Sequence, residues 1–288
     1  MLNDTIVALA TPMMTSALAI IRISGQQAFS LVNKIFSKDL DKIEHSYTTY
    51  GYITYKDDEG NKAASKYGPM SFRHFVLGAI AIFIYVGVEV GIPNVLNKWL
   101  QNPTLNVLGM EAGAEAVAAS VAATYWLLML VGRLVGAAIG SKVSAKVMLS
   151  VASVVGLCLT LGAIFSPVTM MVDMPVFKNS ADGLFGLVNV PINAMMLVLV
   201  GLCTSVMWGG IFNLAVEGLG RYTEKASGIF MALVCGGGVL PLLQNAVVDM
   251  QGGVGYQVSY WVVAVGLVYL LFYALIGSKN VNKDIPVE

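Results

Sequence analysis

Six stretches of the chain are almost continuously apolar, and each is long enough to cross a lipid bilayer. They lie at about residues 75–95, 118–140, 143–165, 191–214, 226–248 and 257–277. A helix rises about 1.5 Å per residue, so about 20 apolar residues cross a hydrocarbon layer about 30 Å thick. The stretches are continuous, whereas the strands of a membrane barrel are short and alternate between apolar and polar residues. The pattern therefore predicts six transmembrane helices.

The N-terminal part of the chain follows a different pattern, with short apolar runs between polar residues. It predicts strands at residues 5–11, 18–24 and 45–55 and an amphipathic helix at residues 26–36. On that helix Phe29, Val32, Ile35 and Phe36 share one side. A piece this small seldom buries a core unaided, because chains below about 70 residues rarely do so. We expect a small α+β soluble fragment of marginal stability.

These two patterns predict the organisation of the chain. Its four parts are an α+β fragment at residues 1–57, a charged linker at 58–70, a six-helix transmembrane domain at 71–280 and a tail at 281–288. The expected fold class is an all-α membrane protein preceded by a small α+β soluble fragment.

Charge and composition support a membrane protein and fix its expected orientation. Only 12% of the residues are charged and the formal net charge is zero, whereas soluble domains carry about 25% charged residues. One set of connections carries nine basic residues, namely Lys62, Lys66, Arg73, Lys142, Lys146, Arg221, Lys225, Lys279 and Lys283. The other set, at residues 99–117 and 166–190 and their flanks, carries Lys98 and Lys178. Positive charge stays on the cytoplasmic side, so we expect a multi-pass protein of the cytoplasmic (inner) membrane with both termini in the cytoplasm.

The same composition argues against several other functions. With no excess of basic residues, the chain has no face that would neutralise a row of phosphates, and nucleic-acid binding is not expected. Cys158, Cys203 and Cys235 each lie in an apolar run, which is typical of buried free thiols. His45 and His74 have no second ligand at the spacing of a metal site. No metal or other cofactor is expected, and the chain is not expected to be an enzyme.

A few polar and aromatic residues interrupt the apolar stretches, and these are the candidate ligand-binding residues. They are Tyr85, Glu89, Asn94, Trp208, Asn213, Gln244 and Asn245. Polar groups at membrane depth usually face a protein interior or an aqueous path. Amides both donate and accept hydrogen bonds and an aromatic face covers sugar C–H groups, so the set suits a polyhydroxylated ligand. Glu89 is either a ligand-binding or proton-linked group or a structural partner for a neighbouring helix.

Arg133 lies near the inner end of the second predicted helix. Its side chain either extends to the lipid headgroups or closes a cytoplasmic gate by pairing with Glu217 or Glu224. The glycines at 132, 136 and 140 are four residues apart, a spacing that lets helix backbones approach closely. The glycines at 236–238 precede Pro241 and either serve tight packing or allow a cavity-lining helix to bend.

Four segments of the membrane part resemble a known family of transporters. They are FRHFVLGAIAIFIYVGVEVGIPN at residues 72–94, GRLVG at 132–136, GGIFNLAVEGLGRYTEKASG at 209–228 and CGGGVLPLLQ at 235–244. In this order they are similar to the major facilitator superfamily, and within it to the fucose and glucose/galactose permeases. The resemblance implies twelve helices in two six-helix halves, with this chain matching the second half. It also implies sugar–proton symport by alternating access, with the sugar site between the halves near the membrane midplane.

Six helices would supply only one wall of such a cavity. We therefore expect the chain to pair with a second copy or with a separate first half, or else to be a truncated product with little activity. The expected partners are the lipid bilayer and a sugar.

The N-terminal fragment resembles a second, unrelated family. NDTIVALATP at residues 3–12, AIIRISG at 19–25 and YTTYGYI at 47–53 are similar to the start of the tRNA modification GTPase that acts on the wobble uridine. Met13 and Met14 stand where that family has a Pro-Gly pair, and the phosphate-binding signature G-x-x-x-x-G-K-[ST] is absent from the sequence. The alternative interpretation is a fusion or truncated product without GTPase activity, or a membrane scaffold for the soluble fragment.

Overall fold

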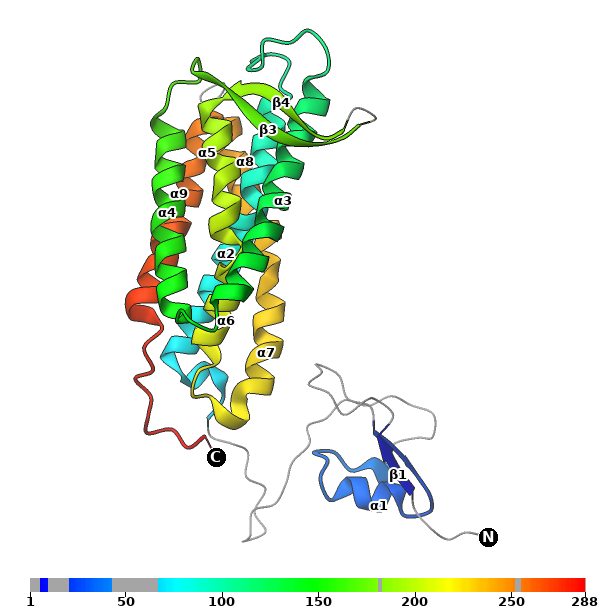
Figure 1. Ribbon diagram of the computed structural model, residues 1–288. Coiled ribbons are helices and arrows are strands. Elements are labelled where there is room, and N and C mark those ends of the chain that lie inside the picture. The colour runs from blue at the N-terminus through cyan, green and yellow to red at the C-terminus, as the bar shows by residue number, and fades with distance from the viewer. Residues whose placement is uncertain (1–5, 10–20, 43–66, 181–182, 252–254, 288) are drawn as a thin grey trace. The chain divides into compact units, whose positions relative to one another are not determined.

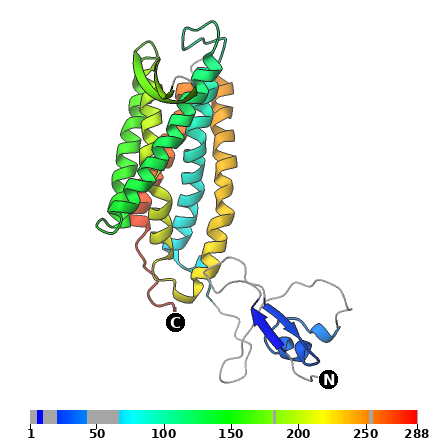
Figure 2. The same ribbon diagram turned by 45° about the vertical axis from the view of Figure 1, so that its right-hand side comes forward.

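The computed structural model describes residues 6–9, 21–42, 67–180, 183–251 and 255–287. The chain forms two compact units, Met1–Gly68 and Pro69–Glu288. Figures 1 and 2 show the long helical bundle of the second unit and the short elements of the first. Each unit is described by itself.

The first unit contains a small antiparallel strand pair followed by a short helix. Strand β1 (Ile6–Leu9) pairs with β2 (Ile21–Ser24), and α1 (Ala28–Asn33) and the 3-10 turn η1 (Leu40–Lys42) follow. Both strands and the helix were predicted from the sequence, although α1 is shorter than the predicted 26–36.

The predicted apolar side of α1 does not form a core among the described residues. No residue of α1 is buried within the described part of this unit, and Phe29 and Ile35 are 52% and 43% exposed. A single short helix beside two four-residue strands has too little surface to cover these side chains. The third predicted strand, at 45–55, lies outside the described residues.

The second unit contains six membrane-spanning segments within the described residues, as the sequence predicted. The first three are single helices, α2 (Arg73–Leu100), α3 (Ala114–Ile139) and α4 (Ala145–Phe165). The last three are interrupted: α5 (Ile192–Thr204) continues into α6 (Met207–Val216), α7 (Thr223–Ala232) into the 3-10 turn η4 (Leu233–Cys235) and α8 (Gly236–Gln251), and α9 (Gly255–Phe272) into a π-helical turn (Tyr273–Gly277). This is a multi-pass membrane protein.

Helix α2 lies at the centre of the bundle. It has the most buried of the six spans in the described chain, and it packs against α3, α5, α6, α8 and α9. Its glycines allow close contacts with these neighbours, since a Cβ atom on Gly87 would lie 2.5 Å from Leu240 Cβ of α8. The central position explains why polar side chains halfway along α2 face protein rather than lipid.

The glycines on α3 also bring two helices together. A Cβ atom on Gly132 would lie 2.7 Å from Ser205 Cβ, and one on Gly136 would overlap the side chain of Val206. Ser205 and Val206 join α5 to α6, so this joint lies directly against α3. The close helix packing predicted from the glycine spacing is confirmed at these two positions. Gly140 differs, because its nearest neighbour is the carbonyl oxygen of Gly136 on its own helix.

The connection at 166–190, which was predicted to be an outward-facing loop, is a β-hairpin, so the loop prediction was wrong here. Strand β3 (Met171–Ser180) pairs antiparallel with β4 (Gly183–Pro191), with Phe177 opposite Phe185. Met174 and Val176 are buried and alternate with exposed residues, as in a half-buried strand. The backbone N–H of Phe177 donates to Thr124 Oγ1 at 2.9 Å, which attaches the hairpin to α3. Figure 1 shows the hairpin at one end of the bundle.

Candidate functional site

An ion pair in the middle of the bundle is the centre of the candidate site. Glu89 lies about 24 Å along α2 from Arg73 and about 16 Å from Leu100, taking about 1.5 Å per residue. Arg133 Nη2 on α3 donates to Glu89 Oε1 at 3.0 Å. The Glu89 side chain is 10% exposed, whereas that of Arg133 is 50% exposed. One partner is therefore fixed in the protein interior and the other faces open space.

Two aromatic residues complete this centre. Tyr85, one turn before Glu89 on α2, is fully buried, and its hydroxyl has no hydrogen-bond partner among the described residues. The Trp208 ring of α6 packs edge-on against the Tyr85 ring, with centroids 6.3 Å apart. The sequence predicted Tyr85, Glu89 and Trp208 as site residues, and the structure brings all three together.

A hollow of about 510 Å³ opens beside the ion pair. Its walls come from α2, α3, α6, the α5–α6 joint and η4, and the lining residues are Val86, Glu89, Arg133, Ser205, Trp208, Gly209 and Val234. A volume of this order falls within the range of small-molecule sites, about 300–1,000 Å³. The charged groups and the indole lie on its surface.

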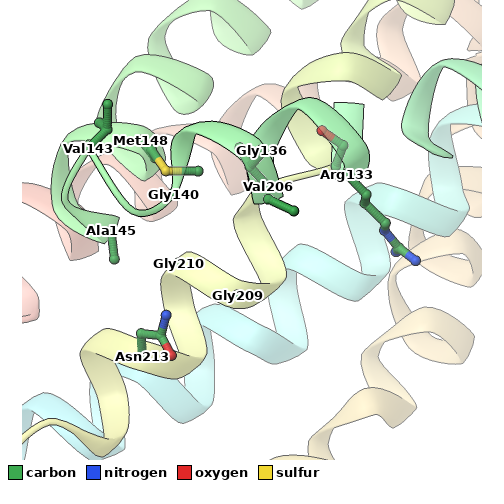
Figure 3. Close-up of a pocket in the computed structure, with 12 residues that line it drawn as sticks. Arg133, Gly136, Gly140, Val143, Ala145, Met148, Val206, Gly209, Gly210 and Asn213 are labelled. Atoms are coloured by element: carbon green, nitrogen blue, oxygen red, sulfur yellow. The ribbon is translucent and has the colours of Figure 1, made fainter. Parts of the chain in front are cut away.

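A second hollow, of about 270 Å³, lies next to the first and shares Arg133, Ser205 and Gly209 with it. It extends to Asn213 on α6 and to the turn between α3 and α4, where Gly140, Val143 and Ala145 line it. Figure 3 shows Arg133 at one end of this hollow and Asn213 and Ala145 at the other. Asn213, another predicted site residue, therefore lies apart from the ion pair and along the path to the α3–α4 end of the bundle.

Asn94 and Asn245 form a separate polar cluster nearer the other end of the bundle. Asn245 Nδ2 donates to the Pro241 carbonyl at 2.6 Å and lies 3.4 Å from Asn94 Oδ1, while Lys98 Nζ donates to Asn245 Oδ1 at 2.8 Å. The cluster joins α2 to α8. Sequence reasoning used Lys98 only for topology, and its spacing of one turn from Asn94 was the signal that could have placed it here.

Gln244 is buried between helices, unlike the other amides among the predicted site residues. It is 1% exposed, its Nε2 lies 3.5 Å from Ser259 Oγ on α9, and its Oε1 approaches Gly91 on α2. It lines neither of the two hollows described above. Its position favours a packing role between three helices.

The pairing suggested for a gate differs from the one in the structure. Arg133 pairs with Glu89 rather than with Glu217 or Glu224, because its side chain extends from α3 toward the centre of α2. Glu217 ends α6 as an exposed residue, and its backbone carbonyl lies 3.0 Å from His74 Nε2. The gating role of Arg133 and Glu217 stays a prediction.

The membrane unit is similar in sequence and in structure to known transporters. Over 226 residues it is 32% identical to a glucose/galactose transporter of Brucella abortus, an alignment that covers 78% of this chain and 48% of the relative. A crystal structure of the major facilitator superfamily transporter FucP in the outward conformation superposes with a TM-score of 0.57 at 18% identity, covering 72% of this chain and 43% of FucP. The six helices have the fold of part of a major facilitator superfamily transporter. The chain spans about half the length of the transporters it matches.

The N-terminal unit is similar to a different family. Residues 5–72 match the family described as GTP-binding protein TrmE N-terminus. The tRNA modification GTPase MnmE of Acholeplasma laidlawii is 44% identical over 55 residues, which cover 19% of this chain and 12% of that protein. Both resemblances drawn from the sequence motifs are thus confirmed, and they apply to different parts of the chain.

Proposed function

We propose that the membrane unit forms one half of a sugar–proton symporter of the fucose or glucose/galactose type, working by alternating access. The observation that carries this proposal is the Glu89–Arg133 pair beside Trp208 on the wall of a hollow at mid-depth in the bundle. The similarity to a glucose/galactose transporter supports the choice of substrate class.

The chemistry of this hollow suits a neutral polyhydroxylated solute. A charged group inside a membrane is unfavourable unless it is paired or hydrated, and the pair satisfies both charges without attracting a counter-ion. The second carboxylate oxygen of Glu89 accepts hydrogen bonds from sugar hydroxyls, the guanidinium donates to them, and the indole covers the apolar C–H face. The buried Tyr85 ring packs edge-on against this indole.

We propose that the Glu89–Arg133 pair serves both proton coupling and gating. Protonation of Glu89 would remove the charge that holds Arg133, and the half-exposed guanidinium would then turn toward the second hollow. In this proposal Arg133 gates the path toward Asn213, and Glu217 borders the inner end of α6. Asn94 and Asn245 border the outer entrance, where Lys98 orients the Asn245 amide.

A second six-helix bundle is needed to close the cavity. The matched transporters are about twice as long as the part of them that this chain covers, and the mid-depth hollow is only partly enclosed by this chain. We propose that a second copy or a separate first-half chain supplies the opposite wall. The proposed location is the cytoplasmic (inner) membrane, with both termini in the cytoplasm, as the distribution of basic residues favours.

The N-terminal unit is proposed to come from a tRNA modification GTPase by gene fusion, without GTPase activity. The two separate similarities, one to residues 5–72 and one over 226 residues, support a fused or truncated product. Peptide mass spectrometry across residues 50–75 tests this directly. A peptide that spans the joint supports the fusion, whereas peptides from two separate proteins would contradict it.

Sugar binding is the decisive test of the transport proposal. Membrane vesicles containing the full chain, with and without a co-expressed first-half permease, are assayed with labelled glucose, galactose and fucose. We expect saturable binding of one of these sugars and loss of binding by Trp208→Ala, with Trp261→Ala, a substitution outside both hollows, as the matched control. No binding in either preparation would refute the transport proposal and favour an inactive product.

A further inference from the structure

The two hollows meet at a position that carries no side chain. Both are lined by Arg133, Ser205 and Gly209. Ser205 is fixed there by its hydroxyl, which donates to the Leu202 carbonyl, and by its contact with Gly132. Arg133 is held by Glu89. Gly209, on the first turn of α6, is the third residue that lines both hollows.

Packing does not require a glycine at position 209. A Cβ atom built on Gly209 meets no atom within 4 Å, whereas one on Gly132, Gly136 or Gly201 would collide with a neighbouring helix. Its backbone also needs no left-handed conformation, since Gly209 is not among the residues with positive φ. Glycine is unfavourable inside a helix by about 1 kcal/mol relative to alanine. What this glycine provides is open space at the junction of the hollows.

The chemistry along the two hollows is consistent with a path for a polar solute. The mid-depth end carries Glu89, Arg133 and Trp208, and the other end carries Asn213 at the α3–α4 turn. Figure 3 shows Gly209 between Arg133 and Asn213. Between these polar ends the path is bordered by small residues such as Gly136 and by the apolar side chains of Val206 and Met148.

We propose that the two hollows form one permeation path for a hexose-sized neutral solute, and that Gly209 sets the width of their junction. This inference rests on the proposed transport function. In this proposal the absence of a side chain at Gly209 lets the solute pass between the hollows, and the ligand binds in the mid-depth hollow. A side chain at this position would narrow the passage without displacing Glu89 or Trp208.

The test separates the path from the identity of the sugar. In the full chain with Cys158, Cys203 and Cys235 replaced by alanine, Val86→Cys places a thiol in the mid-depth hollow. Sealed vesicles are treated with a charged, membrane-impermeant methanethiosulfonate reagent from the side of the α3–α4 turn. We expect Gly209→Leu to slow labelling at least tenfold. Gly228→Leu is the matched control and should leave labelling unchanged, because a Cβ atom on Gly228 also meets no atom within 4 Å and Gly228 lines neither hollow.

The same variants are then assayed for binding and entry of labelled hexose. Gly209→Leu should admit hexose at least tenfold more slowly than the parent, and Gly209→Ala, the smaller change, should fall between the two. Labelling of Val86→Cys at the parent rate in Gly209→Leu would overturn the inference while leaving the transport proposal intact. Slow labelling together with no hexose binding by the parent would overturn the transport proposal and its sugar, and would leave Gly209 as the junction of an aqueous path.

Discussion

Removing Arg133 from the Glu89–Arg133 pair should lower the free energy of unfolding by more than removing the charge of Glu89. Breaking a fully buried ion pair costs about 3–5 kcal/mol, because the remaining charge is left without compensation. After Arg133→Ala the uncompensated group is Glu89, whose side chain is only 10% exposed. Because half of the Arg133 side chain already faces open space, solvent screening lowers the expected loss to about 2 kcal/mol.

The opposite substitution should cost less. After Glu89→Gln the remaining charge is Arg133, which is 50% exposed and can turn toward the hollow. We expect a loss below about 1 kcal/mol, since a mobile, hydrated guanidinium needs no buried partner. The double variant Arg133→Ala/Glu89→Gln should be more stable than the sum of the single effects implies, with a coupling free energy of about 1–2 kcal/mol.

The measurement is equilibrium unfolding of the full chain in mild detergent micelles, followed by loss of helical circular dichroism. Lys142→Ala is the matched control, since Lys142 is an exposed cation beside the end of α3 and should leave the unfolding free energy close to that of the parent. Equal losses for the two single variants, or additive effects in the double variant, would refute the argument that Glu89 is the buried and dependent partner.

Three further substitutions test other contacts. Thr124→Val removes the acceptor of the Phe177 N–H, so we expect a loss of about 1 kcal/mol and faster proteolysis within β3–β4, and unchanged proteolysis would contradict this attachment. Gly201→Ala places a Cβ atom 2.8 Å from the Tyr125 carbonyl oxygen, so we expect a loss of about 1–3 kcal/mol in unfolding that Gly228→Ala does not show. Asn245→Leu removes the acceptor of Lys98 Nζ, and we expect faster amine modification of Lys98 than in Leu242→Ala, an exposed site on the same helix.

The position of the ion pair could not be predicted from the sequence, although both residues could be singled out. Glu89 and Arg133 are conspicuous because charged residues are rare in apolar stretches. Their distance depends on how α2 and α3 are rotated and shifted against each other, and the glycine contacts at Gly132 and Gly136 help to decide that. The sequence therefore suggested Glu217 or Glu224 as partners on the basis of their expected depth, and the packing placed Glu89 within reach instead.

The β3–β4 hairpin shows a different limit. Apolar Met174 and Val176 are separated by one residue in the sequence, as in a half-buried strand. The residue between them, however, is Pro175. Proline is tolerated in a two-stranded ribbon because each strand has an open edge. The signal was therefore weaker than that of the helices.

The sequence by itself determined that the chain crosses a membrane six times after a small α+β fragment, because continuous apolar length is a local property that requires no knowledge of neighbours. It also determined which polar residues are unusual at membrane depth. Only the tertiary structure decided which of these residues meet. Glu89, Arg133 and Trp208 line one hollow, with Tyr85 packed against Trp208, whereas Asn94 and Asn245 form another cluster and Gln244 lies buried beside Ser259. Such groupings depend on the rotation and depth of each helix, which are set by packing between segments far apart in the sequence.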